Sequence, residues 1–216
     1  MKTTALIITL AASLLSLPAR ATPPANRGIG DDIRGELAQA RHEVRRDLAQ
    51  SRRELETGNL SLGDGLQFGD KRKHAKLPRA EISPAGDFLI EGKAQDITAT
   101  QRRQLLAYRG LLVELGKAGI DIGERTAAAT LEAVGNMSVA GMMFGAFTGG
   151  IERKVERMMQ EQVEPGVRGI CRRLPRVRAS QQQLAASLPA FRPYATLEAD
   201  GARACERDVR AEFASL

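Results

Sequence analysis

The sequence predicts a mainly α-helical fold with a small antiparallel β meander, an α+β protein in which a long charged N-terminal helix precedes a helical domain. Three observations predict it: an 11-residue repeat near the N-terminus, a segment punctuated by glycine turns, and amphipathic stretches with helix start and stop signals. We expect four parts: residues 1–21 as a signal peptide, 22–57 as a charged amphipathic helix, 58–97 as a β meander with a basic loop, and 98–216 as the helical domain.

The first 21 residues have the pattern of a secretory signal. Lys2 precedes an apolar run from Ala5 to Leu17, and Ala19-Arg20-Ala21 gives the small residues that signal peptidase needs. The run is shorter than the roughly 20 residues of a membrane-spanning helix, although an uncleaved anchor is an alternative. We expect export to the periplasm, with secretion as the second possibility.

The N-terminal helix is predicted from a repeat. Residues 32–42 and 43–53 match closely, and Glu54-Leu55 begins a third copy. The repeat places one narrow apolar stripe along a helix, formed by Ile33, Leu37, Val44, Leu48 and Leu55. Eleven residues over three turns favour a right-handed twist against a partner helix. We expect this stripe to be an interaction surface that packs on another helix, in the same chain or in another; a solvated helix laid on its own domain is the alternative.

Residues 58–97 read as short strands and turns. Gly58 ends the helix, residues 60–68 indicate one or two strands, and residues 71–76 form a basic loop. A small meander follows, with turns predicted at Pro84–Gly86 and at Glu91-Gly92.

The helical domain begins at a capping box. Thr98 and Gln101 predict a helix over 99–117, with Gly119 behind it. Its buried face is expected to consist of Leu105, Tyr108, Leu112 and Leu115. 

The rest of the domain is divided by glycine and proline. We expect helices over about 152–163 and 167–174, broken by Pro165-Gly166 and stopped by Pro175. Ser180 is expected to start another helix, and Thr196 to cap a last one, on which Cys205, Val209 and Phe213 share a face.

The chain contains two cysteines, Cys171 and Cys205. In an oxidising compartment such a pair predicts one disulfide, closing a loop of about 35 residues and contributing roughly 3–4 kcal/mol. Two buried unpaired thiols are the alternative.

Glycines recur at every fourth position in a low-charge stretch: Gly141, Gly145 and Gly149. This spacing lets another backbone approach one face of a helix, so we expect these glycines to be a second interaction surface. Insertion of the neighbouring Met and Phe side chains into a membrane surface is the alternative.

Composition argues against most catalytic and nucleic-acid functions. The formal charge is +6, tryptophan is absent, and aromatic residues make up 4% of the chain, too few for typical base-stacking platforms. Nucleophile-elbow, zinc-protease and phosphate-loop motifs are missing, and His42 and His74 both lie in charged stretches. We therefore expect no catalytic residues, no metal site, no cofactor and no nucleic-acid partner.

Residues 80–122 carry a more specific pattern. Ile82, Pro84 and Gly86 form an I-x-P-x-G hairpin, Gly92-Lys93 a short turn, and Thr98, Gln101, Arg102 and Tyr108 mark the helix that follows. This pattern resembles the YggN-like family of bacterial periplasmic proteins, and the similarity extends over roughly 54–205. The resemblance implies an exported, mainly helical protein and brings no established activity.

These observations together favour a non-enzymatic envelope protein that acts by binding a protein partner or by self-association. The second expectation is a peripheral protein that contacts an anionic membrane surface through its basic and Met/Phe/Gly-rich segments. Basic residues for such contact lie in the loop and around Cys171: Lys71, Arg72, Lys73, Lys76, Arg79, Arg168, Arg172, Arg173, Arg176 and Arg178. An enzyme of unrecognised class is the third expectation.

Overall fold

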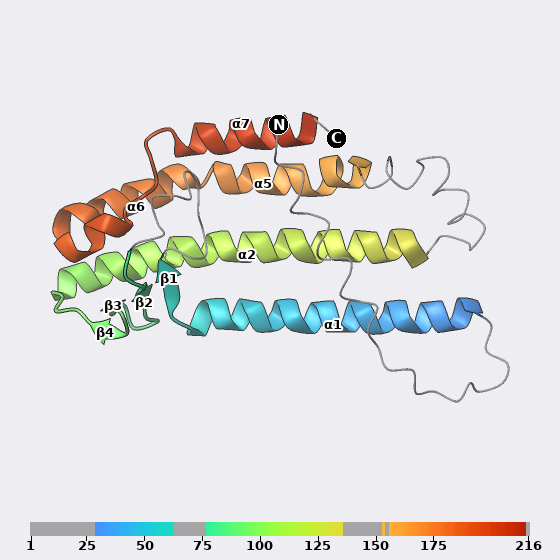
Figure 1. The fold of residues 1–216 in the computed structure, drawn as a ribbon, viewed down its shortest axis with the longest axis horizontal. Helices are drawn as coiled ribbons and strands as arrows, with labels where there is room; N and C mark the ends of the chain where they lie inside the picture. Colours follow the sequence, from blue (N-terminus) through green and yellow to red (C-terminus); the bar gives the residue numbers. More distant parts are fainter. Residues whose placement is uncertain (1–28, 63–76, 136–152, 154–155, 215–216) are drawn as a thin grey trace.

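Helices and one small sheet make up the fold, as the sequence predicts. The computed structural model describes residues 29–62, 77–135, 153 and 156–214. In the described part the long helices are α1 (Ile29–Thr57), α2 (Ala99–Gly135), α5 (Glu164–Cys171), α6 (Leu174–Ser187) and α7 (Gly201–Ala214). The axes of α1, α2, α5 and α7 are roughly parallel and follow one another across the molecule (Figure 1).

The sheet has four antiparallel strands in the order β1-β2-β3-β4, so it is the predicted meander. The strands are β1 (Leu60–Leu62), β2 (Ala80–Ile82), β3 (Phe88–Ile90) and β4 (Lys93–Ala94). Both predicted turns are present. Gly86 has φ +81° and Gly92 has φ +74°, a backbone conformation that glycine adopts without steric cost.

We call the compact end of the molecule the head: the sheet, residues 99–115 of α2, α6 and the 3₁₀ helix η5 (Pro189–Tyr194). Its core includes Phe88, Leu105 and Phe191, each 0% exposed. Phe88 and Tyr108 both contact the Phe191 ring, at centroid distances of 5.7 and 5.5 Å. The predicted buried face of α2 is confirmed, since Leu105, Tyr108, Leu112 and Leu115 are all buried.

The motif behind the family resemblance serves to assemble this head. Thr98 and Gln101 form the expected capping box, each backbone N–H donating to the other's side chain. Arg102 donates to the Asp87 carboxylate and to the Ala85 carbonyl, so it ties the β2–β3 turn to α2. These side chains are engaged in holding the fold together.

The prediction that the first long domain helix ends near Lys117 is wrong. α2 continues to Gly135, passing through Gly116, Gly119 and Gly123. Glycine costs up to about 1 kcal/mol in a helix, but α2 is packed between α1 and α5 along this stretch. The packing of α2 on both sides outweighs the low helix propensity of these glycines.

The predicted proline breaks are also placed differently. Pro165 lies in the first turn of α5, directly after a π-helical turn, η4 (Met159–Val163). Pro175 likewise lies in the first turn of α6, which therefore begins before Ser180. The chain is helical on both sides of Pro165, and the Glu164 N–H donates to the Met159 carbonyl five residues back, so the wider π turn accommodates a residue that has no N–H. Pro175 follows a turn, and a proline in the first turn of a helix loses no helical hydrogen bond. The last helix begins at Gly201, so Thr196 does not cap it.

Candidate functional site

α1 packs along α2 with the opposite chain direction (Figure 1). We call α1 together with residues 116–135 of α2 the arm. The apolar stripe of α1 faces α2, and its members Leu37, Val44, Leu48 and Leu55 are all half-buried. The side chain of Ile33 lies outside the described residues. Packing on a second helix is thus confirmed, and the partner belongs to the same chain.

The two helices of the arm are in close contact where the arm joins the head. A Cβ atom at Gly116 would lie 2.5 Å from Leu55 Cδ2, so the absence of a side chain there allows Leu55 to reach the α2 backbone. Arg109, 8% exposed, places its Nη2 group 2.8 Å from the carbonyl oxygens of both Glu56 and Gly58. The last carbonyls of a helix have no partner within it, so Arg109 caps α1 from the neighbouring helix.

Further along, ion pairs connect the two helices. Arg52 Nη2 lies 2.6 Å from Asp121 Oδ1 and 3.7 Å from Glu124 Oε2. Lys117 pairs with Glu56, and this hydrogen-bonded contact lowers the pKa of the Glu56 carboxyl below its ordinary value. 

Beyond these pairs the helices enclose a groove of about 410 Å³. Its apolar lining comes from Val44, Ala127, Ala128 and Leu131. The α1 wall also carries two arginines and the α2 wall two glutamates: Arg41 and Arg45, and Glu124 and Glu132. Within the described part of the chain, Arg41, Arg45 and Glu132 have no ion-pair partner. An apolar floor between walls of opposite charge suits the side of another amphipathic helix.

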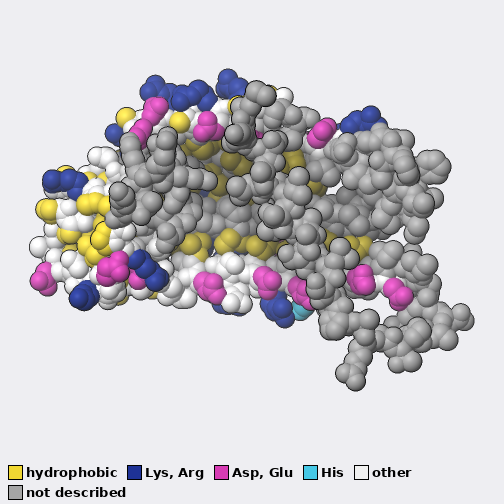
Figure 2. All heavy atoms as spheres, viewed as in Figure 1, with side chains coloured by type: hydrophobic (Ala, Val, Ile, Leu, Met, Phe, Trp, Pro, Cys, Tyr) yellow, Lys and Arg dark blue, Asp and Glu magenta, His cyan; other side chains and the backbone are white. Residues whose placement is uncertain are grey.

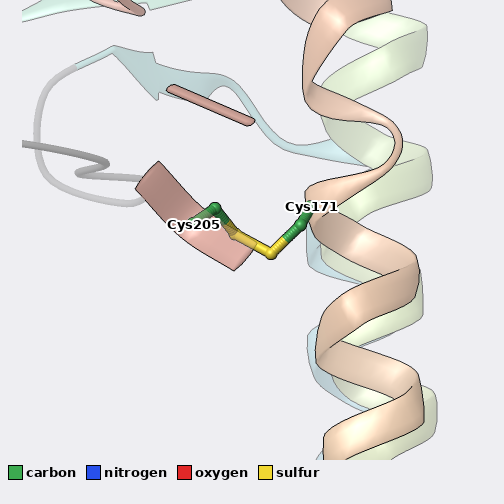
Figure 3. Close-up of a disulfide and its surroundings, with 2 residues drawn as sticks. All are labelled: Cys171 and Cys205. Carbon is green, nitrogen blue, oxygen red and sulfur yellow. A yellow bond between two sulfur atoms is a disulfide. The ribbon is translucent and has the colours of Figure 1, made fainter. Parts of the chain in front are cut away.

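The second region of interest is the α5–α7 pair. The structure joins Cys171 and Cys205 by a disulfide with an S–S distance of 1.99 Å (Figure 3). Cys171 is fully buried with Val209 and Phe213, so the predicted pairing and shared face on α7 are both present. The bond fastens α7 to α5.

The described residues do not bring together a metal-binding cluster. No three His, Cys, Asp or Glu side chains among them lie close enough to share a metal ion. His42 is exposed and His74 lies outside the described residues. Burial raises the pKa of Tyr108 to about 12, against an opposing hydrogen bond from Gln181, but this hydroxyl belongs to the head core.

The predicted glycine surface, Gly141, Gly145 and Gly149, lies outside the described residues, as does the basic loop at 71–76. Sequence reasoning missed the glycines that the described structure does use for close packing. Besides Gly116, these include Gly166, where a Cβ would lie 2.5 Å from Ile122 Cγ1. The signal available for Gly116 was its position among Gly110, Gly119 and Gly123 in a stretch that otherwise has helical periodicity.

Every helix in the described part of the chain is too short or too polar to serve as a membrane span. Comparison of the chain with protein-family models, curated proteins and solved structures finds no match. The resemblance to the YggN-like family therefore remains a prediction from its motif.

Proposed function

We propose that this protein is a non-enzymatic component of the bacterial envelope that acts by protein binding or assembly through the arm. The observation that carries the proposal is the groove between α1 and α2, whose apolar floor is open and whose charges include Arg41 and Glu132 without ion-pair partners in the described part of the chain.

The composition of α1 supports this function. No α1 side chain that the structure describes is fully buried, although the helix has 29 residues. A helix of this length in water depends mainly on tertiary packing of its apolar face. Contact with α2 covers only part of that face, so a further helix laid in the groove would complete it.

Export is the second part of the proposal. The N-terminal pattern predicts a cleaved signal, and a Cys171–Cys205 disulfide is compatible with an oxidising compartment such as the periplasm. Both features are consistent with a partner in the envelope.

A photo-crosslinking residue at Ala128 tests the proposal, because Ala128 is exposed and lines the groove. The matched control places the same residue at Ala211, which is exposed on α7. After irradiation of intact cells, we expect a protein adduct from position 128 and none from position 211. Equal labelling from both positions, or none from 128, would contradict the proposal.

A second candidate function is contact with an anionic membrane surface. Residues 165–197 contain six arginines and no acidic residue. Arg172, Arg173 and Arg176 are exposed there, and basic side chains also gather over α7 at the upper edge of Figure 2. Each such charge contributes about 1 kcal/mol near an anionic surface.

Vesicle co-sedimentation tests this second function. Arg172→Glu with Arg176→Glu should weaken binding to anionic vesicles by tenfold or more, since each reversal exchanges an attraction of about 1 kcal/mol for a repulsion. The matched control, Arg41→Glu with Arg45→Glu, makes the same change of charge in the arm. If both variants sediment like the wild type, the arginine surface has no role in membrane contact.

A further inference from the structure

We propose that the groove is occupied by the arm of a second copy of this chain, so that two arms form a four-helix bundle about a two-fold axis parallel to the helices. This inference rests on the proposed function and names the partner.

Two pairs of opposite charges lie one repeat apart along the arm. Arg52 pairs with Asp121 at 2.6 Å. Arg41 lies 11 residues before Arg52, and Glu132 lies 11 residues after Asp121. Because the helices run in opposite directions, these two steps lead to the same level of the arm. The structure agrees, since Arg41 and Glu132 both line the groove.

Arg52 and Asp121 form an ion pair, whereas Arg41 and Glu132 do not. Arg41 and Glu132 form no ion pair with each other or with any other residue that the structure describes. The arm thus presents one positive and one negative charge at one level, on opposite walls, above an apolar floor. Such a surface is complementary to a rotated copy of itself.

Two dimer geometries would bring two such surfaces together, and the charges distinguish them. An axis perpendicular to the helices places α1 over the partner's α1, so that basic wall meets basic wall. An axis parallel to the helices places α1 over the partner's α2, so that Arg41 of each copy faces the glutamate wall of the other. Isologous contacts of the second kind satisfy both walls at once.

The repeat of α1 supports a bundle with more than two helices. Gln39 donates to Glu43 at 2.9 Å, and Gln50 donates to Glu54 at 2.7 Å, the same bond one repeat further along. On one side of the apolar stripe lie Arg41, Arg45 and Arg52, and on the other Glu43, Asp47 and Glu54. Figure 2 shows acidic side chains in a row along α1. Charged edges of this kind set partner choice and orientation in helical bundles.

The mixture of charges also separates this partner from a membrane. An anionic surface attracts a patch of one sign, whereas this groove carries arginine on one wall and glutamate on the other. A helix of an unrelated protein remains as an outcome of the test.

Light scattering and sedimentation of the purified protein test the proposal with two charge-reversal variants, Arg41→Glu and Glu132→Arg. We expect the wild type to have twice the monomer mass and each variant to dimerise about tenfold more weakly, because each reversal sets like charges face to face at two symmetric positions. An equimolar mixture of the two variants should recover wild-type association, since every facing pair is then opposite in sign. The matched control is Arg53→Glu, an exposed residue outside the groove, which should leave the mass unchanged.

A variant carrying both reversals in one chain should dimerise like the wild type, which separates a lost contact from a lost fold. A monomeric wild type overturns the proposal, as does an equal effect of Arg41→Glu and Arg53→Glu. If the cross-link from position 128 joins a different protein, self-association is wrong while the proposed function stands. If position 128 gives no adduct and the purified protein is monomeric, both are wrong.

Discussion

The head and the arm are built from different interactions, although α2 runs through both. In the head, α2 buries Leu105 and Leu115, which are 0% and 2% exposed. In the arm, the same helix meets a half-buried stripe and is joined to α1 by Arg52–Asp121 and Lys117–Glu56. Along this one helix, apolar burial stabilises the head, whereas the arm leaves apolar and charged surface exposed, as the proposed binding function requires.

Polar groups follow the same division. In the head, Gln181 is 4% exposed and its Nε2 donates to the Tyr108 hydroxyl and the Tyr194 carbonyl, while its Oε1 accepts from the Leu197 N–H. In the arm, Arg41 and Glu132 have no ion-pair partner in the described part of the chain. The buried amide of Gln181 thus has hydrogen-bond partners for both of its polar atoms, whereas Arg41 and Glu132 are exposed charges at the groove.

The largest expected effect tests the division directly. Leu105→Ala should lower the free energy of unfolding by about 4 kcal/mol, because it leaves a cavity in a fully buried site. Leu48→Ala makes the same change in the half-buried stripe and should cost about 1 kcal/mol. Urea denaturation of both variants measures this. Equal losses would mean that the arm and head share one core.

Removal of the disulfide should have the next largest effect. Replacing Cys171 and Cys205 together by Ala should lower the free energy of unfolding by about 3 kcal/mol. The disulfide closes a loop between residues 34 positions apart and so lowers the conformational entropy of the unfolded chain. Hydrogen exchange should show the loss first in α7, which the bond fastens to α5. If exchange in α1 increased as much as in α7, the disulfide would be supporting the arm as well.

Arg109→Met should cost about 2 kcal/mol and act at the junction of the two regions. It removes the donor that caps the C-terminal carbonyls of α1 while keeping much of the buried stem. Amide exchange should rise near residues 54–58, and the head should keep its protection. Unchanged exchange there would show that water caps this helix end equally well.

The smallest expected effect is a dependence of stability on pH. Hydrogen bonds lower the pKa of Glu56 through Lys117 in the arm, and of Asp87 through Arg102 and Ser83 in the head. Each ionised carboxyl therefore stabilises the fold at a pH above its ordinary pKa, which is 4.5 for Glu56 and 3.8 for Asp87. This contribution is lost as the pH falls through the lower pKa that the carboxyl has in the folded protein. Thermal melts between about pH 6 and about pH 3 should show a slope that Glu56→Gln reduces. An unchanged slope would mean that the contact between Glu56 and Lys117 does not contribute to the stability of the arm.

Local signals determined much of the architecture from the sequence. The Thr98/Gln101 capping box, the glycines at positions 86 and 92, and the apolar spacing of Leu105 and Leu112 all act within a few residues, and each has the predicted result. The 11-residue repeat likewise predicted the face of α1 that packs on another helix. Residue type and spacing determine this local geometry directly, because the backbone has few other conformations available at such positions.

Long-range contacts set where the helices end and which surfaces of the arm stay exposed. α2 continues past Gly116 in a stretch packed between α1 and α5, and Leu55 of α1 lies in the space that a side chain at Gly116 would occupy. Arg109 caps a helix that ends more than 50 residues earlier in the chain. The open charges of the groove depend on the register of α1 against α2, which brings Arg41 to the level of Glu132. Contacts between segments far apart in sequence decide all three, because they set which surfaces are buried and which stay available, and no local pattern contains that information.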